Sequence, residues 1–543
     1  MMTTTQENLE LNKLKKLYHK TVKIFGPPGT GKTHTLIERV LKGYMKKGVP
    51  PQQIAYLSFT NKAVNTAVTR AMEAFPEYSS EDFARFKTLH TYCRRYFSEE
   101  VFDPKQCTID FALQTKIIKT SDTRLADDNF TYKDWSLAIY SKARNLLMDP
   151  DKAYKRESYK KDSLAIFQRK ISTYEHYKQH GGEKPYIDFD DMIEKAIGLD
   201  FPKLKVLILD EAQDCTPLQW SVIYKMADKV DKIYLAGDDD QGIYKWNGAD
   251  PKYFTTFFPG RKVKLRKTRR FGEAIYKFSQ IIRRGILDSE EKDYGYKDKT
   301  GYVKSYLTFK EIPFEELKED WYILGRVNKA VNELRMLAKD AGLYYKDNKD
   351  TKCFDIKQWE AIKGWTAISN NKKIDKKQAR NMYQYIRELE KPEYRSEKFW
   401  LGEPDYKEYD FKELKDWCGL ELENKNKHWF WILRRNFKPN QIRHFIRLLR
   451  RYGQEELDKE PRITIDTIHS VKGGEANHVV LYGKGNYPSH FHTKNKEEKI
   501  NEKKVWYTGA TRAKRTLHLL RTDYKYNYPL GSDYLIYVQE KND

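Results

Sequence analysis

The stretch GPPGTGKT, residues 26–33, follows the apolar run TVKIFG and precedes HTLIERVLKGYMKKG, a sequence typical of a helix. A glycine-rich loop between a strand and a helix turns backbone N–H groups toward phosphate oxygens, and the helix N-terminus adds partial positive charge. In this pattern Lys32 is expected to reach the β- and γ-phosphates of a nucleotide, and the Thr33 hydroxyl is expected to bind Mg²⁺. The stretch therefore predicts a nucleoside triphosphate site in an α/β fold. The residues expected to contact the nucleotide here are Gly26, Pro27, Pro28, Gly29, Thr30, Gly31, Lys32, Thr33 and His34.

Two sets of short apolar runs are typical of buried parallel strands. They do not alternate with polar residues, and helical patterns separate them, which indicates sheets covered on both faces. The first set is TVKIFG (21–26), IAYLSFT (54–60), KVLILDE (205–211) and KIYLAGD (232–238). The second set is WYILGRV (321–327), RITIDTIHS (462–470), HVVLYG (478–483) and TLHLLRT (516–522). We therefore predict an α/β fold of two lobes.

A long stretch of helical pattern, rich in Lys, Arg and aromatic residues, interrupts each lobe. The predicted parts are 1–91 with 188–258 for the first lobe, 92–187 for its mainly helical insertion, 259–345 with 461–543 for the second lobe, and 346–460 for its helical insertion.

The composition favours a polyanionic partner. The 543 residues carry a net charge of +23, which indicates nucleic acid as the first partner to consider. The five cysteines have no C-x-x-C spacing, so a zinc ribbon is not expected and a reducing compartment fits. No run approaches the ~20 apolar residues of a membrane span. We expect a soluble, cytoplasmic protein, in a bacterium or in a virus-infected host cell.

In the stretch KVLILDEAQD (205–214), two carboxylates follow the apolar residues. The apolar residues place Asp210 and Glu211 at the carboxyl end of a strand, where ligands bind in α/β sheets. Asp210 is expected to hold Mg²⁺, and Glu211 to polarise the attacking water. Gln213 and Asp214 extend this site.

The stretch AGDDDQGIYKWNGA (236–249) places three carboxylates beside two large aromatic residues in a strongly basic chain. Together with GPPGTGKT, LDEAQD, TIHSVKGGE and YTGATRA, it resembles in order and character the motifs of superfamily 1 helicases, closest to the UvrD/Rep-like branch. The resemblance covers both lobes but not the insertions in detail. It implies two RecA-like lobes with ATP in the cleft between them, and movement 3′→5′ on single-stranded DNA that lies across both lobes and reaches duplex junctions.

The resemblance also assigns roles to residues. It implies Glu211 as the catalytic base, Gln241 as the γ-phosphate sensor, and Arg270 and Arg512 as arginines that reach the γ-phosphate. It implies nucleotide contacts for Arg269 and Glu475. The residues that match DNA-contacting positions are Phe59, Thr60, Asn61, Thr88, His90, Tyr244, Trp246, Thr467, His469 and Ser470.

Four departures from the family pattern concern base selection and packing. No glutamine motif precedes the loop, because Gln6 lies too far upstream and Leu11 stands at the matching position. His34 replaces an arginine, Arg269 replaces a base-stacking tyrosine, and Gly474 and Ala476 replace bulkier residues in the fifth motif. An arginine plane stacks on a base by cation–π contact, so ATP is expected and other nucleoside triphosphates stay open.

The tail stretch RTDYKYNYP (521–529) resembles the strand-separating hairpin of the family. Tyr524, Tyr526 and Tyr528 are the candidates for its wedge, and ordinary packing of an edge strand is the alternative.

Three functions remain open at this stage. The leading hypothesis is an ATP-dependent 3′→5′ DNA translocase and helicase with bound Mg²⁺. A second is a translocase that displaces proteins from DNA without processive unwinding. A third is a non-motor clamp on nucleic acid, against which the intact catalytic set argues. RNA is a weaker alternative to DNA, because nothing in the sequence predicts recognition of a 2′-hydroxyl.

Overall fold

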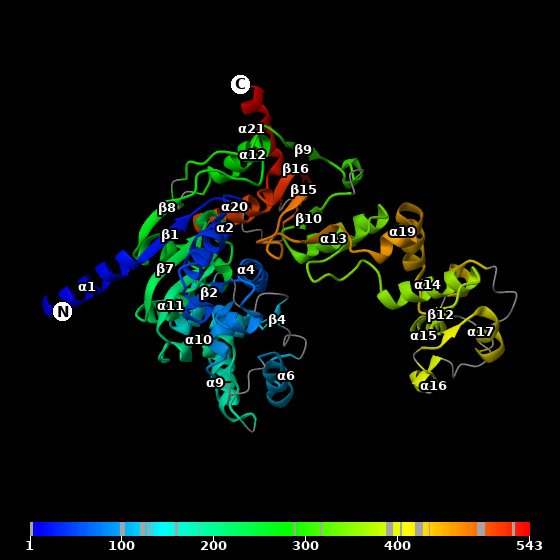
Figure 1. Ribbon diagram of the computed structural model, residues 1–543, viewed down its shortest axis with the longest axis horizontal. Coiled ribbons are helices and arrows are strands. Elements are labelled where there is room, and N and C mark those ends of the chain that lie inside the picture. Colours follow the sequence, from blue (N-terminus) through cyan, green and yellow to red (C-terminus); the bar gives the residue numbers. More distant parts are fainter. Residues whose placement is uncertain are drawn as a thin grey trace.

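The computed structural model describes residues 4–542 except 98–103, 120–124, 127–130, 133, 158–160, 183, 287–288, 291, 315–317, 387–394, 402–403, 405, 419–426, 434, 486–494 and 524–526. In the described part of the chain, two parallel six-stranded sheets form the centres of two lobes (Figure 1), which confirms the predicted α/β fold class.

The first sheet has the strand order β3-β2-β6-β7-β1-β8, and all neighbouring pairs are parallel. Its strands are β1 (Thr21–Phe25), β2 (Ile54–Ser58), β3 (Phe86–Thr88), β6 (Leu204–Leu209), β7 (Val230–Gly237) and β8 (Arg261–Lys264). The helices of this lobe are α1 (Thr4–Lys20), α2 (Lys32–His34), α3 (Lys42–Met45), α4 (Asn61–Ala74), α5 (Leu89–Arg94), α10 (Phe189–Ala196) and α11 (Pro217–Ala227).

Side chains of the first sheet alternate between two cores. Ile54 and Tyr56 pack with residues of α4 on one face, whereas Ala55 and Leu57 pack with residues of α5, α10 and α11 on the other. Because successive side chains of a strand point to opposite faces, a continuous apolar run is what a sheet covered on both sides requires. The apolar runs in the sequence do not alternate with polar residues because helices cover both faces of the sheet.

The second sheet has the order β11-β14-β10-β15-β16-β9 and is also parallel throughout. Its strands are β9 (Tyr302–Tyr306), β10 (Trp321–Gly325), β11 (Tyr345–Lys346), β14 (Ile463–Thr467), β15 (Ala476–Tyr482) and β16 (Ala513–Leu520). The helices of this lobe are α12 (Glu273–Arg283), α13 (Asn328–Asp340), α20 (Lys496–Ala510) and α21 (Leu530–Asn542).

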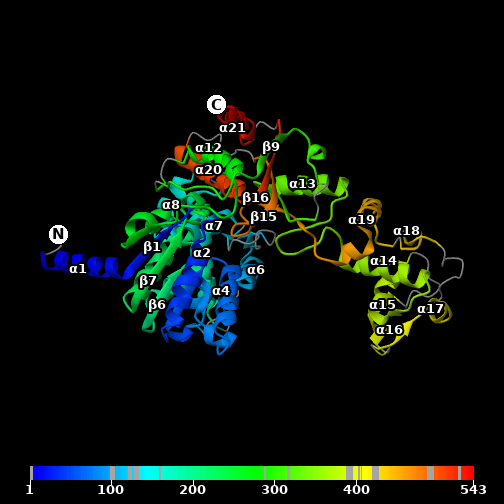
Figure 2. The ribbon, with the colours of Figure 1, turned by 45° about the horizontal axis from the view of Figure 1, so that its top comes forward.

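Helices dominate both insertions. The first contains α6 (Pro104–Thr115), β4 (Leu125–Ala126), β5 (Thr131–Tyr132), α7 (Trp135–Asn145), α8 (Pro150–Arg156) and α9 (Leu164–His180). The second contains α14 (Ile356–Ser369), β12 (Ile374–Asp375), α15 (Lys376–Tyr385), α16 (Glu397–Leu401), β13 (Glu408–Tyr409), α17 (Phe411–Cys418), α18 (Trp429–Ile432) and α19 (Pro439–Asp458). The second insertion has an aromatic core of its own and lies apart from both sheets in the two views (Figures 1 and 2).

The structure differs from the predicted lobe boundary at residue 259. Strand β8 pairs in parallel with β1, so the first lobe extends to Lys264. All four residues of β8 are exposed, and its sequence RKVK lacks the apolar run that marks the other strands of the lobe. Strand β8 is an edge strand. It is recognised by its pairing with β1, because its own sequence has no hydrophobic pattern that predicts a strand.

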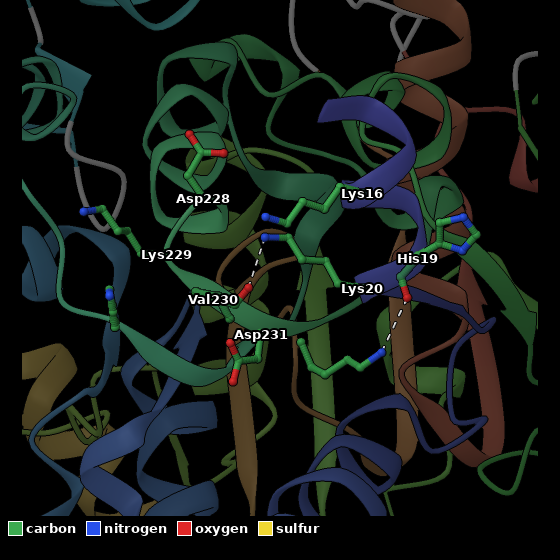
Figure 3. A pocket seen from close by; sticks show the side chains of 9 residues that line it. Lys16, His19, Lys20, Asp228, Lys229, Val230 and Asp231 are labelled. Carbon is green, nitrogen blue, oxygen red and sulfur yellow. Dashed lines mark hydrogen bonds between the residues drawn. The ribbon is translucent and has the colours of Figure 1, made fainter. Parts of the chain in front are cut away.

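The last turns of helix α1 bring Lys16 and Lys20 close to Asp228 and Val230, at the amino end of β7 (Figure 3). Lys20 donates from Nζ to the carbonyl of Val230 at 3.0 Å and to that of Ala227, the last residue of α11. Lys16, Asp228 and other charged residues line the cavity around it. Burial lowers the pKa of Lys20. Because this cavity lies before the first residue of β1, at the amino ends of the strands, it is separate from the phosphate loop. No helix in the described residues is both long and apolar enough to span a membrane.

Candidate nucleotide and nucleic-acid site

The phosphate loop leaves the carboxyl end of β1 and enters α2 through two left-handed glycines. Gly29 has φ +73° and Gly31 has φ +88°, conformations that glycine adopts without steric cost. Lys32 is buried, and its Nζ donates to the carbonyl of Gly26 at 2.6 Å, so its charge lies inside the curve of the loop. His34 is exposed on the first helical turn.

Thr33 and Asp210 form the oxygen pair that the sequence predicts as a magnesium site. Thr33 donates from Oγ1 to Asp210 Oδ2 at 2.6 Å, and the Tyr56 hydroxyl donates to the same oxygen at 3.3 Å. Burial, together with the neighbouring Glu211, raises the pKa of Asp210 to about 6. A buried carboxylate beside a hydroxyl gains from a cation, and Mg²⁺ typically takes one or two protein oxygens besides phosphate and water. The donor set therefore fits Mg²⁺.

Glu211 is held next to Asp210 in a left-handed conformation, with φ +56°. A non-glycine residue in this region costs of order 1 kcal/mol or more and is typical of functional sites. Burial opposes its charge, but Lys32 and Lys472 hold the pKa of Glu211 below its ordinary value. Its Oε2 accepts from Gln213 Nε2 at 2.7 Å. The two adjacent carboxylates thus have pKa values that are shifted in opposite directions.

The three aspartates after β7 are buried and face two cations of the second lobe. Lys292 Nζ lies 2.6 Å from Asp238 Oδ1, 2.6 Å from Asp239 Oδ1 and 2.7 Å from Asp240 Oδ2. Arg283 Nε lies 2.8 Å from Asp240 Oδ2. The negative charge that is conspicuous in the sequence is therefore neutralised across the boundary between the lobes.

Gln241 occupies the junction of a hydrogen-bonded chain between the lobes. Its Nε2 donates to Asp238 Oδ2 at 2.6 Å, and its Oε1 accepts from Nη2 of Arg512. The Asp238 N–H donates to Gln213 Oε1 at 2.9 Å, and Gln213 reaches Glu211. The second-lobe arginine thus contacts the predicted sensor directly, and the predicted base is linked to the sensor through Gln213 and Asp238.

Arg270 and Glu475 form an ion pair on the second lobe beside the loop. Arg270 Nε lies 2.7 Å from Glu475 Oε2, and its Nη1 donates to the carbonyl of Thr511. Thr268 donates from Oγ1 to the carbonyl of Pro28 at 2.8 Å. A Cβ added at Gly29 would lie 2.4 Å from the Cβ of Arg270, so this segment lies directly against the phosphate loop.

The other second-lobe nucleotide residues differ in burial. Arg512 is 2% exposed, and burial with Arg270 nearby lowers its pKa to about 9. Arg269 is exposed and lines a cavity of about 630 Å³ with Glu475 and Lys514. Arg270 also lines this cavity, so the predicted nucleotide residues Arg269, Arg270 and Glu475 lie together on the second lobe.

A groove of about 500 Å³ brings together the residues expected to contact DNA, and we call it the aromatic groove. Its lining includes every predicted DNA-contacting residue except Thr467, which lies beside it and bonds to Ser470. From the first lobe these residues are Phe59, Thr60, Asn61, Thr88, His90, Tyr244 and Trp246, and from the second lobe His469 and Ser470.

Aromatic stacking shapes one wall of the aromatic groove. The rings of Phe59 and Tyr244 stack at 4.7 Å, and Lys472 Nζ lies 4.8 Å from the Tyr244 ring centroid. Tyr244 is 7% exposed, so it is a supported ring at the base of the wall, whereas Trp246 is 36% exposed. Burial lowers the pKa of His90 to about 4 and that of His469 well below its ordinary value, so both imidazoles are neutral at pH 7.

The tail tyrosines do not support a wedge at Tyr528. This residue is 3% exposed and its ring stacks on Trp506 at 4.6 Å, so it belongs to the core of the second lobe. That prediction is corrected for Tyr528, because a ring buried in a core is not available to a duplex end. Tyr524 and Tyr526 lie outside the described residues.

Several residues that sequence reasoning did not single out contribute to the site. Lys472 donates from Nζ to Asp214 Oδ1 and to the carbonyl of Gln241, each at 2.6 Å. It lies within the quoted motif TIHSVKGGE, so its position was visible but its partner was not. Asn145 and Asp190 line the aromatic groove, and Asn145 Nδ2 donates to Asp190 Oδ1 at 2.7 Å. Their pairing joins residues 45 positions apart and has no local signal.

The two α/β lobes, with the phosphate loop on one and arginines supplied by the other, define a two-lobed P-loop nucleotide-binding protein. Residues 7–259 match the family model of the UvrD/REP helicase N-terminal domain. Over these residues, somewhat under half of its length, the chain is similar to the UvrD/REP helicases.

The relatives that the chain resembles are distant. It is similar to the ATP-dependent DNA helicase PcrA of Bacillus subtilis, with 23% identity over 67% of this chain and 50% of the relative. It is also similar to the probable DNA helicase II homolog of Mycoplasma pneumoniae, with 22% identity over 92% of this chain and 81% of the relative. A solved structure of PRRSV helicase aligns with 96% of this chain and 56% of its own, at 10% identity and a TM-score of 0.32. The chain spans about half the length of the PcrA relatives it matches.

Proposed function

We propose that this protein hydrolyses ATP with Mg²⁺ to move 3′→5′ along single-stranded DNA and to unwind duplex at junctions. The observation that carries the proposal is the segment 238–249. Gln241 in this segment contacts Arg512 at the nucleotide site, and Tyr244 and Trp246 a few residues later line the aromatic groove. One short peptide therefore touches both the site of hydrolysis and the site of strand binding.

The residues at the nucleotide site have distinct roles in hydrolysis. Lys32 and the loop amides hold the phosphates, and Thr33 with Asp210 would hold the metal. Mg²⁺ supplies charge neutralisation on the phosphate oxygens when bound. Glu211, ionised at neutral pH, accepts the proton of the attacking water, and Gln241 orients that water. Arg270 and Arg512 place positive charge where negative charge develops.

The placement of the two arginines makes hydrolysis depend on contact between the lobes. Arg270 and Arg512 belong to the second lobe, whereas Lys32 and Glu211 belong to the first. A γ-phosphate between them favours the closed arrangement, and its loss removes that bridge. Because the aromatic groove is also lined from both lobes, closing and opening changes the spacing of the groups that grip the strand.

The chemistry of the aromatic groove suits a single strand. Stacking on an aromatic ring accepts any base, and a net charge of +23 favours a polyanion. The relatives named DNA helicases support DNA as the partner. The 3′→5′ direction follows the family resemblance.

The proposal is tested with duplexes that carry a 3′ or a 5′ single-stranded tail, each with ATP, GTP or no nucleotide. We expect unwinding of the 3′-tailed substrate with ATP, and phosphate release stimulated by single-stranded DNA. Lys32→Ala should abolish both activities. Unwinding by Lys32→Ala with ATP, or the absence of DNA-stimulated hydrolysis in the natural protein, would refute the mechanism.

A further inference from the structure

The segment that follows β7 starts on the first lobe but packs into the core of the second. Ile243, Tyr244 and Ala249 belong to the hydrophobic core that contains Phe278, Leu517 and Trp506. Gln241 lies between the strand and this anchored part. Its side-chain orientation therefore depends on how the second lobe holds the preceding aspartates.

Lys292 is the second-lobe residue that contacts all three of the aspartates after β7. Its side chain is 3% exposed and lies within 2.7 Å of a carboxylate oxygen of each of the three aspartates. Burial alone would lower the pKa of Lys292, but the three carboxylates raise it, so the ammonium stays charged. A compact cation that is surrounded in this way fixes the positions of its acceptors.

The two oxygens of Asp238 have different partners. Oδ1 accepts from Lys292 Nζ at 2.6 Å, and Oδ2 accepts from Gln241 Nε2 at 2.6 Å. With its nitrogen bound to Asp238, Gln241 presents its oxygen to Arg512. The ammonium of Lys292 and the carboxamide of Gln241 are therefore bound to the two oxygens of one carboxylate.

We propose that Lys292 is a positioning residue for Gln241, which it orients through Asp238. The inference rests on the proposed function, since it assigns Gln241 the orientation of the attacking water. Among the described contacts, Lys292 bonds to the three aspartates and to none of the residues expected to contact nucleotide or DNA.

Arg283 provides the matched comparison. It also contributes a cation to the aspartates, half-buried and 2.8 Å from Asp240, but among the described contacts it has none with Asp238. If the cations serve only to neutralise charge, then loss of either should have the same effect on hydrolysis. If Lys292 orients Gln241, then only its loss should reduce turnover.

The test uses the full chain and three variants, Lys292→Met, Asp238→Asn and Arg283→Met, with melting temperature and steady-state hydrolysis measured on each. Lys292→Met should lower the DNA-stimulated kcat at least tenfold and leave the KM for ATP within threefold. Arg283→Met should lower the melting temperature comparably but keep kcat within threefold. Loss of one preorganised polar contact to a transition state costs ~10²-fold or more in kcat, and loss of its orientation is expected to cost at least a tenth of that factor.

Asp238→Asn keeps the inference testable if Lys292→Met does not fold, because it leaves two aspartates opposite two cations. Its amide must point the oxygen at Lys292 and the nitrogen at Gln241, which forces the Gln241 carboxamide to turn. We expect the same loss of kcat, and a crystal structure in which Gln241 no longer donates to residue 238. Equal loss of kcat in Lys292→Met and Arg283→Met, or full kcat in a folded Asp238→Asn, would overturn the inference. If the natural protein shows no hydrolysis, the proposed function fails and the orientation of Gln241 in the variant crystals decides the inference alone.

Discussion

Adjacent carboxylates acquire different chemistry from their surroundings. Asp210 faces Thr33 and Tyr56, whereas Glu211 faces Lys32 and Lys472. The first gains most from a cation and the second stays ionised without one. The difference arises because Asp210 ends a buried strand and Glu211 takes a left-handed turn toward the second lobe.

The pKa of Asp210 predicts a competition between protons and Mg²⁺. Burial and the charge of Glu211 raise this pKa to about 6, so the carboxyl gains a proton as the pH falls through 6. A proton and a metal exclude each other on one oxygen pair. The Mg²⁺ concentration that half-saturates ATP hydrolysis should therefore rise about fourfold between pH 7.5 and pH 5.5. Titrations of Mg²⁺ at the two values test this, and an unchanged half-saturation point would contradict it.

Substitutions of Gln241 and of Trp246 should have separate effects on ATP hydrolysis and on the binding of single-stranded DNA. Gln241→Ala removes the contact with Arg512 and should lower DNA-stimulated kcat, with the Kd for single-stranded DNA within threefold. Trp246→Ala removes the exposed ring and should weaken DNA binding by ~1–3 kcal/mol, with the KM for ATP unchanged. Fluorescence anisotropy with a labelled oligonucleotide and a phosphate-release assay measure the two effects. Full DNA-stimulated hydrolysis in both variants would contradict the assignment.

At the scale of elements, a buried ion cluster fixes the first insertion to its lobe. Arg144 on α7 lies 3.3 Å from Asp188, 2.6 Å from Asp191 and 2.8 Å from Glu194. Lys178 on α9 contacts Asp188 at 3.1 Å. The cluster therefore joins α7 and α9 to α10, beside the wall of the aromatic groove.

Arg144→Met should destabilise this joint strongly. Removing one partner from a buried ion cluster leaves uncompensated charge and costs roughly 3–5 kcal/mol. Lys142→Met is the control on the same helix, because Lys142 pairs with Glu157 near the surface and its loss should cost less than ~1 kcal/mol. Hydrogen exchange of α7 and α10 amides measures both. Equal protection in the two variants would show that the cluster contributes no net stability.

Most elements of the two sheets were predictable, and the exceptions have physical reasons. The strands on either side of the nucleotide site are buried on both faces, so their sequences are continuous apolar runs. Strand β8 has no such run, because it lies exposed at the sheet edge. Among the candidate site residues, those in local motifs could be proposed from the sequence alone. The partners Lys292 and Arg283 were missed because their role depends on aspartates more than 40 positions away, which no periodicity encodes.

At the scale of the whole molecule, the lobes meet through buried polar contacts as well as the nucleotide site. Lys472 reaches from the second lobe to Asp214 and to the carbonyl of Gln241. Burial raises the pKa of Asp214 to about 7 even with this partner present. Lys472 thus forms an interlobe contact, which we call the strap. The strap lies between the nucleotide site and the aromatic groove.

Lys472→Met should loosen the closed arrangement of the lobes. Truncating one side of a buried charged contact costs ~2–5 kcal/mol. Two dyes, one on α4 and one on α13, should report a larger average separation in this variant, together with reduced DNA-stimulated hydrolysis. Lys514→Met is the control, since Lys514 pairs with Glu475 inside the second lobe. An unchanged dye separation in Lys472→Met would argue against a strap.

The crossing between the lobes begins where β8 ends. From Lys264 the chain runs alongside the phosphate loop: Leu265 N–H donates to the carbonyl of Phe25, and Arg269 N–H donates to that of Gly29, each at 2.8 Å. With the bond from Thr268 Oγ1 to the carbonyl of Pro28, these contacts hold the crossing peptide to β1 and to the phosphate loop at three points. We therefore expect a rotation of the second lobe to displace the backbone of the phosphate loop through these contacts. Lengthening this peptide by a few residues would leave every motif intact, and it would weaken the mechanical coupling between the second lobe and the phosphate loop.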